Sequence, residues 1–115
     1  MQATNTDHPE AVQKLIEAVL NSPAETGSEL RHSLEAYAAT MDGAQRDPAE
    51  LPTDLESFVI KLSERPHEIS DEDIQALTTA GYSDEEIFEI TISAALGSSL
   101  ARLERGFELV KGLSK

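Results

Sequence analysis

The sequence predicts an all-α protein of five helices, two of them short or weakly defined, with a long buried helix at its C-terminal end. Apolar residues recur at intervals of three and four, which is the spacing of one helix face. Serine, proline and glycine stand where helices would begin and end. No segment has the alternating pattern of a strand. The 115 residues fit one helical domain, 1–115, whose core must consist of Leu, Ile, Val and Ala because only 4% of the residues are aromatic.

The first helix is expected after residues 1–6, which are polar and which we expect to be disordered. Pro9 suits the first turn of this helix, and Asp7 or His8 precedes it as a cap. The residues that follow have helical spacing and predict one apolar face: Val12, Leu15, Ile16, Val19 and Leu20.

The second helix has two possible starts. Ser22 and Glu25, with Pro23 between them, have the spacing of a capping box, in which each side chain bonds the other residue's backbone N–H. Gly27 weakens this start and favours one nearer Ser28. The apolar stripe of this helix is Leu30, Leu34, Tyr37 and Met41. Gly43 then suits a left-handed helix end, and a loop follows.

The third helix is predicted to begin at another capping box, Thr53 with Glu56. Its expected apolar face consists of Leu55, Phe58, Val59 and Leu62. Pro66 follows the end of the helix.

Two similar acidic phrases, SDEDI at 70–74 and SDEEI at 83–87, mark the next two helix starts. Ser70 with Asp73 and Ser83 with Glu86 are spaced as capping boxes, and their carboxylates suit the positive end of the helix dipole. Apolar residues flank both, as hydrophobic staples require: Ile69 with Ile74, and Tyr82 with Ile87. A calcium loop counted from Asp71 would need glycine at its sixth position and glutamate at its twelfth, where this chain has Ala76 and Tyr82.

The last helix is predicted from about Asp84 to Lys111, after a short helix closed by Gly81. Between Ile87 and Ala101 it is apolar or small on nearly every side, which predicts a buried central helix. Its small residues would let neighbouring helices approach closely: Ser93, Ala94, Ala95, Gly97, Ser98, Ser99 and Ala101. Arg102, Glu104, Arg105 and Glu108 can pair along the helix, either on a solvated face or at a subunit contact.

The charge and the absence of cysteine exclude several classes of function. The formal net charge is −13, and residues 70–89 hold seven acidic residues and no basic one. Such a surface repels nucleic acid and anionic lipid, so neither is an expected partner. Without cysteine the chain has no thiol nucleophile, no disulfide and no cysteine-based zinc site. We expect no cofactor and no metal. No signal-like or membrane-spanning apolar run is present, so we expect a cytoplasmic protein.

Histidines are the main candidates for chemistry. The segment HEISD at 67–71 resembles half of a zinc-protease motif, but Asp71 replaces the second histidine and His67 precedes the helix. His67 is therefore expected in an exposed loop. His8 is expected to act as a cap or to have no role. His32 lies mid-helix and is the one candidate catalytic residue, as a general acid or base, against the simpler interpretation of a solvated side chain.

Residues 55–110 resemble the C-terminal part of the alkylhydroperoxidase D-like, or carboxymuconolactone decarboxylase-like, superfamily. The residues that carry the resemblance are Lys61-Leu62, Pro66, Asp71 to Leu77, Ala80 to Ile87, and Ser93 to Leu103. The resemblance implies an orthogonal helical bundle whose subunits assemble into dimers, trimers or hexamers.

Many members of that superfamily carry Glu, then C-x-x-C, then His on an upstream helix, and the two thiols reduce peroxides. If His32 is the motif's histidine, then Glu25 and Ser28 occupy the two thiol positions. Neither residue can form a disulfide. The resemblance thus supports the fold and the assembly, and the missing thiols argue against thiol peroxidase activity.

Whether the chain is an enzyme stays open at this point. The first hypothesis is a non-redox member of the superfamily, an accessory or binding subunit that forms a homo-oligomer. The second is a cysteine-independent, carboxymuconolactone decarboxylase-like lyase that acts on a small organic acid through His32 or carboxylates. A third is a protein partner for a larger enzyme. A pocket around His32 would favour the lyase, and an exposed His32 would favour the binding subunit.

Overall fold

The computed structural model describes residues 8–113, which form five α-helices and a short 3-10 helix and contain no β-strand. The helices are α1 (Glu10–Asn21), α2 (Ser28–Met41), α3 (Thr53–Glu64), α4 (Asp71–Thr79) and α5 (Asp84–Leu113), and the 3-10 helix is η1 (Pro66–Glu68). The all-α prediction is confirmed. The expectations for residues 1–6 and for an Asp7 cap concern positions outside the described residues.

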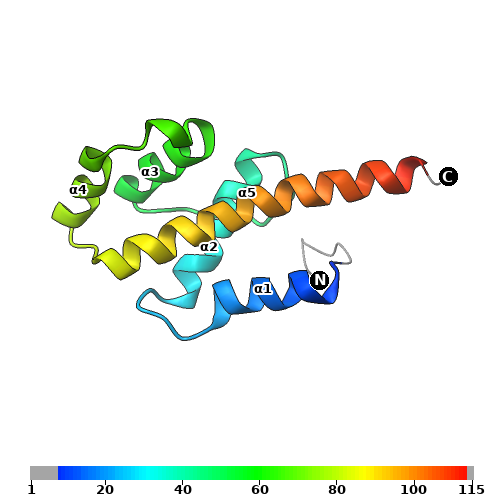
Figure 1. Cartoon of the computed structure of the whole chain (residues 1–115), viewed down its shortest axis with the longest axis horizontal. Helices are drawn as coiled ribbons and strands as arrows, with labels where there is room; N and C mark the ends of the chain where they lie inside the picture. Colours follow the sequence, from blue (N-terminus) through cyan, green and yellow to red (C-terminus); the bar gives the residue numbers. More distant parts are fainter. Residues whose placement is uncertain (1–7, 114–115) are drawn as a thin grey trace.

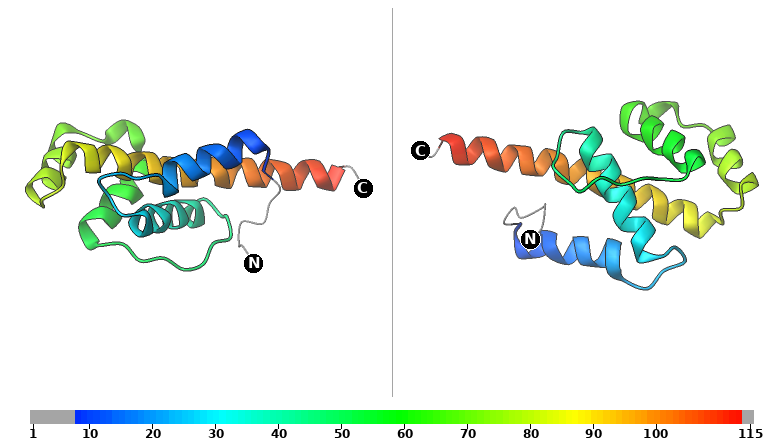
Figure 2. Two further views of the ribbon diagram at one scale, coloured as in Figure 1. Left: turned by 90° about the horizontal axis from the view of Figure 1, so that it is seen from below. Right: turned by 180° about the vertical axis from the view of Figure 1, so that it is seen from behind.

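Helix α5 is the axis of the fold. It has 30 residues, which corresponds to about 45 Å of helix. Figure 1 shows α2 crossing behind α5, with α1 on one side of it and α3 and α4 on the other. The C-terminal turns of α5 extend past all the other helices (Figures 1 and 2). No helix within residues 8–113 is long and apolar enough to cross a membrane.

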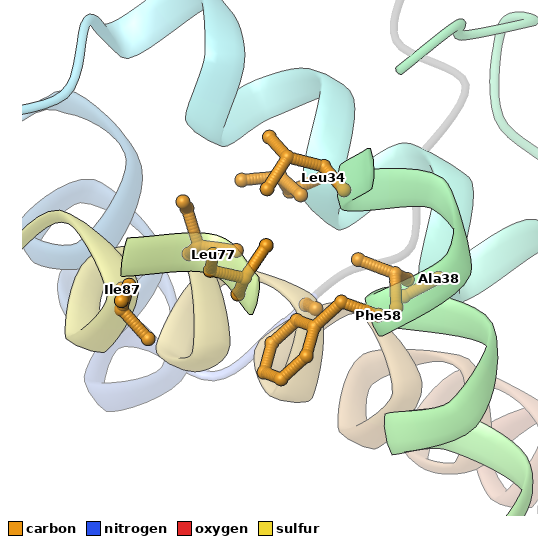
Figure 3. Packing of buried hydrophobic residues seen from close by; sticks show 9 residues of the cluster. Leu34, Ala38, Phe58, Leu77 and Ile87 are labelled. Atoms are coloured by element: carbon orange, nitrogen blue, oxygen red, sulfur yellow. The ribbon is translucent and has the colours of Figure 1, made fainter. Parts of the chain in front are cut away.

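The main core lies between α2, α3, α4 and the first half of α5 (Figure 3). It buries nine residues: Leu34, Ala38, Leu55, Phe58, Val59, Leu77, Ile87, Ile90 and Ala94. Ile69, Ile74 and Tyr82 pack against this cluster, so both predicted staples border the same core. The predicted apolar face of α3 is confirmed, since Leu62 also packs there.

A second, smaller core joins α1 to the middle of α5. Leu20, Leu96 and Leu100 are buried in it, and Val12, Ile16, Val19 and Leu103 pack against them. Leu15 was expected on the same face of α1, but its side chain is 52% exposed. The reason is that α2 and α5, the two helices that contact α1, leave the side of α1 with Leu15 open.

The central helix α5 is buried on one side only, which corrects the prediction that nearly every side is covered. Ser93, Ala94, Gly97 and Ala101 are buried, but Phe88 is 61% and Ile92 is 38% exposed. Ala95 and Ser99 are exposed too. The small residues do allow a close approach, because a Cβ atom at Gly97 would overlap the carbonyl oxygen of Glu35 in α2.

The capping predictions have mixed outcomes. Ser70 and Asp73 form the predicted box at α4. Ser83 and Glu86 do the same at α5, with the Glu86 N–H 3.1 Å from Ser83 Oγ and the Ser83 N–H 2.9 Å from Glu86 Oε1. Gly81 (φ +111°) and Gly43 (φ +93°) both have the left-handed backbone expected after a helix.

Two other predicted boxes are wrong. Ser22 ends α1, and α2 begins at Ser28 after Gly27, as the alternative start proposed. Thr53 is the first residue of α3 and makes no cap. The carboxylate of Glu56 instead accepts a hydrogen bond of 2.8 Å from the hydroxyl of Tyr37. Burial, with a smaller contribution from Glu56, raises the pKa of Tyr37.

Candidate functional site

His32, the predicted catalytic residue, lies on the surface of α2. Its side chain is exposed, and Nε2 lies 2.7 Å from Oδ1 of Asn21 at the end of α1. It lines none of four open pockets on the surface of the fold. The structure therefore places His32 on the surface, where it links α1 and α2 and meets solvent outside these four pockets.

The residues at the two thiol positions belong to the junction of α1, α2 and α5. Ser28 Oγ donates a hydrogen bond of 2.7 Å to the carbonyl of Leu20. The carboxylate of Glu89 accepts bonds from the N–H of Glu25 (3.1 Å), the N–H of Thr26 (2.7 Å) and the Thr26 hydroxyl (2.6 Å). The hydroxyl of Thr26 is the main reason why the pKa of Glu89 is lowered.

Arg31 stabilises the same junction from the interior of the fold. Its side chain is buried, and its two terminal nitrogens donate bonds of 2.7 Å to the carbonyls of Val19 and Ser22. It also lines an open pocket of about 270 Å³ between α1 and α5, whose exposed rim includes Phe88 and Ile92. Because these carbonyls are the unsatisfied end of α1, Arg31 acts as its cap.

A second group of buried charges forms at the other end of the fold. The side chain of Arg46 is 4% exposed and lies between the carboxylates of Glu35 and Glu104, which are 8% and 12% exposed. Nη2 of Arg46 is 2.9 Å from Oε2 of each carboxylate. Burial opposes the charge on Arg46, but the hydrogen bonds to Glu104 and Glu35 outweigh it and raise its pKa. We call Glu35, Arg46 and Glu104 the arginine cluster.

His8 adjoins the arginine cluster, and its side chain does not cap α1, which corrects one of the two expectations for this residue. Its side chain is 5% exposed, and Nε2 lies 3.3 Å from Oε2 of Glu104, without the alignment of a hydrogen bond. Its carbonyl accepts a bond of 2.9 Å from Gln13. The predicted cap position of α1 is occupied by Pro9, which has no side-chain bond to offer.

An open pocket of about 590 Å³ lies beside the arginine cluster. Glu104 belongs to both, and the other lining residues are Asp42, Gly43, Ala44, Gln45, Ala101, Arg105 and Glu108. Arg105 and Glu108 are paired at 3.2 Å, as their spacing predicted, whereas Glu104 turns to Arg46. The wall of this pocket is mainly polar, and Glu104 in it also contacts His8, which does not itself line the pocket.

The structure offers little basis for a metal site. Within residues 8–113 no group of three or more histidine, aspartate and glutamate side chains is placed to hold an ion. His67 lies in η1 and is exposed, as predicted, and its nearest carboxylate is Glu68 at 3.9 Å. Asp71 begins the next helix, so the HEISD segment does not form one helical face.

Two further pockets flank α3. One of about 210 Å³ lies between α3 and α5, next to Ser63 and Ser98, and another of about 400 Å³ lies over Lys61 and Asp73. Lys61 Nζ is 2.9 Å from Asp73 Oδ2, and this bond is the main cause of the lowered pKa of Asp73. Oδ2 of Asp73 also accepts the hydrogen bond from the Ser70 N–H in the capping box, so the ion pair with Lys61 and the capping box together stabilise the start of α4.

No protein-family model matches the chain, and no curated protein matches it. The site must therefore be interpreted from its own geometry. That geometry brings together Glu35, Arg46, Glu104 and His8, none of which sequence reasoning selected as a site. The one signal was Arg46 itself, an isolated base in a segment where Asp42, Asp47 and Glu50 are acidic.

Proposed function

We propose that the chain is a non-redox member of the alkylhydroperoxidase D-like superfamily, a cytoplasmic helical subunit that binds and assembles without thiol chemistry. One observation carries this proposal. The segment that corresponds to the family's thiol pair is used to join helices, because Ser28 bonds Leu20 and the Glu25 and Thr26 amides bond Glu89. The exposed position of His32 supports the same conclusion.

The proposal also includes homo-oligomerisation. The exposed apolar side chains Phe88 and Ile92 lie on the longest helix of the fold, where a neighbouring subunit would cover them. A protein partner other than a second copy is the alternative occupant of this face.

The test is dithiol-dependent reduction of an organic peroxide by the purified protein. We expect the wild-type rate to equal the blank. The matched control is the double variant Glu25→Cys, Ser28→Cys, which places two thiols at the positions that the resemblance assigns to them. Turnover by this variant alone would support both the family and the position of its motif, whereas turnover by the wild type would overturn the non-redox proposal.

A cysteine-independent lyase acting on a small organic acid is the second candidate, and one observation favours it. Glu104 lines the 590 Å³ pocket, and the buried His8 lies behind it with Nε2 3.3 Å from Oε2 of Glu104, so a histidine contacts a carboxylate that faces a cavity. In this version His8 replaces His32 as the acid–base residue. Incubation with a panel of small organic acids, followed by NMR, tests for this lyase activity. Conversion by the wild type that is lost in His8→Ala would favour the lyase over the binding subunit.

A further inference from the structure

The face of α5 that points away from α2 carries a stripe that is exposed over most of its length, although Leu103 also borders the second core. Gly97 points at Glu35 of α2, and at 100° per residue the opposite side of the helix carries one residue at every third or fourth position. In Figure 1 this side faces the viewer, and α2 lies behind the helix. The stripe consists of Phe88, Ile92, Ala95, Ser99, Leu103, Gly106, Val110 and Leu113. All are exposed except Leu103 and Gly106, which are half-buried.

The stripe is symmetric about Ser99. Leu103 and Ala95 each lie four residues from Ser99, and Gly106 and Ile92 each lie seven residues from it. In an antiparallel pair of α5 helices related by a two-fold axis at Ser99, Ile92 therefore meets the partner's Gly106. Ala95 likewise meets the partner's Leu103. In these two pairs a large side chain faces a small one, whereas Phe88 and Val110, each eleven residues from Ser99, are both large and apolar. Ser99 at the centre lets the two helices come close together.

The charges along α5 favour the same antiparallel direction. Its first turn contains Asp84, Glu85 and Glu86. Its second half contains Arg102, Arg105 and Lys111 together with Glu104 and Glu108. With the axis at Ser99, an antiparallel pair brings Lys111 of one helix close to the acidic first turn of the other. It also opposes the two helix dipoles favourably. A parallel pair would place six carboxylates together at one end.

Two pockets provide room for the partner's side chains. The pocket of about 270 Å³ separates α5 from α1 at Phe88 and Ile92. The pocket of about 210 Å³ separates α5 from α3 at Ala95, Ser99 and Arg102. They flank the stripe on either side, so a second α5 can lie on the first with side chains filling both hollows.

We propose that two copies of this chain pair through α5 in antiparallel orientation, with the two-fold axis at Ser99. The pairing deepens the assembly proposed above and can fail independently of it, since the peroxide assay does not depend on the oligomeric state. The face of α5 that packs on α2 determines the fold, and the opposite face determines the assembly. Trimers or hexamers then require a further contact outside this stripe.

Cysteine cross-linking tests the orientation sharply, because the natural chain has no cysteine. Ser99→Cys should oxidise to a covalent dimer. Ile92→Cys alone should not, because two copies of that residue would lie about 21 Å apart along the helix axis, and Gly106→Cys alone should behave likewise. An equal mixture of these two variants should cross-link. Self-cross-linking by either variant, without a mixed product, would indicate a parallel pair and overturn the proposal.

Analytical sedimentation tests whether the stripe on α5 forms the contact between the two copies. The wild type should sediment as a dimer or larger at micromolar concentration, and Ile92→Glu should raise the dissociation constant by about 100-fold or more, because it buries an unpaired charge. Leu15→Glu is the control, since Leu15 is an exposed apolar residue of α1 outside the stripe. A monomeric wild type would overturn the proposal and leave the face for another protein, and so would an assembly that Ile92→Glu leaves intact.

Discussion

Gly97 lies where α5 crosses α2, and it shows how one residue positions two helices. A Cβ atom there would overlap the carbonyl oxygen of Glu35 and would lie 3.1 Å from the amide nitrogen of Ala39. Both obstacles belong to the backbone, so no side-chain rotation relieves them. The close approach also buries Glu35, whose carboxylate then needs Arg46.

Gly97→Ala is expected to destabilise the fold by about 1–3 kcal/mol or more, because α5 must move away from α2. Urea denaturation followed by circular dichroism measures the change. Gly112→Ala is the matched control: it lies in the same helix with nothing within 4 Å of the added atom. There the better helix propensity of alanine should leave stability unchanged or slightly higher. Equal midpoints for wild type and Gly97→Ala would contradict the close packing.

At the scale of the helix, the starts of α4 and α5 show why some capping patterns succeed and others fail. Ser70 and Ser83 follow extended or turning segments, so their side chains can turn back to the third helical residue. Ser22 still belongs to the end of α1, where its hydroxyl bonds the carbonyl of Ala18. Thr53 is already helical. The spacing of a capping box is thus necessary, but the backbone before it decides whether the box forms.

Removal of the α5 cap by Ser83→Ala should lower the free energy of unfolding by about 1 kcal/mol, since the Glu86 N–H loses its 3.1 Å partner. Ser57→Ala is a suitable comparison because Ser57 is exposed in the interior of α3. That change should have little effect or stabilise slightly. If both variants unfold at the wild-type denaturant midpoint, the Ser83 cap is not formed in solution.

At the scale of the whole molecule, the lowered pKa values of two carboxylates predict how the free energy of unfolding depends on pH. Asp73 and Glu89 have lowered pKa values in the folded protein, through Lys61 and Thr26 respectively. Their stabilisation is therefore present above the pKa values of the unfolded chain and is lost as pH falls through the folded values. Protonation of the other acids relieves the repulsion of a −13 charge at the same time, so the total pH dependence is a sum of opposing effects.

The variant Glu89→Gln isolates the contribution of the Glu89 carboxylate to the pH dependence of stability. The variant should be less stable than the wild type at pH 7, and the difference should shrink as pH falls through the lowered pKa of Glu89, where the wild-type carboxylate is itself protonated. Glu85→Gln removes the same charge from the same helix without touching the junction at Thr26. If the difference in free energy of unfolding between the wild type and Glu89→Gln stays constant from neutral to acidic pH, the charge of Glu89 does not contribute to stability.

The contrast between local and distant contacts explains what the sequence could predict. The starts of α4 and α5, Gly43, Gly81 and the face of α3 depend on residues a few positions apart, so their patterns are visible along the chain. The arginine cluster joins Arg46 to Glu104 across 58 residues, and no local pattern marks such a meeting. The exposed side of α5 could not be predicted either, because a helix that is small and apolar all round does not reveal how many neighbours cover it.

The buried side chain of Arg46 has a consequence for how the chain is degraded. Residues 42–52 form an irregular segment between α2 and α3, and such segments are ordinarily the first places that a protease cuts. A protease that recognises arginine must withdraw Arg46 from between Glu35 and Glu104 before it can cleave there. Cleavage at this bond therefore follows the rate and extent of local opening. The loop thereby reports on the folded state of the helices that it connects.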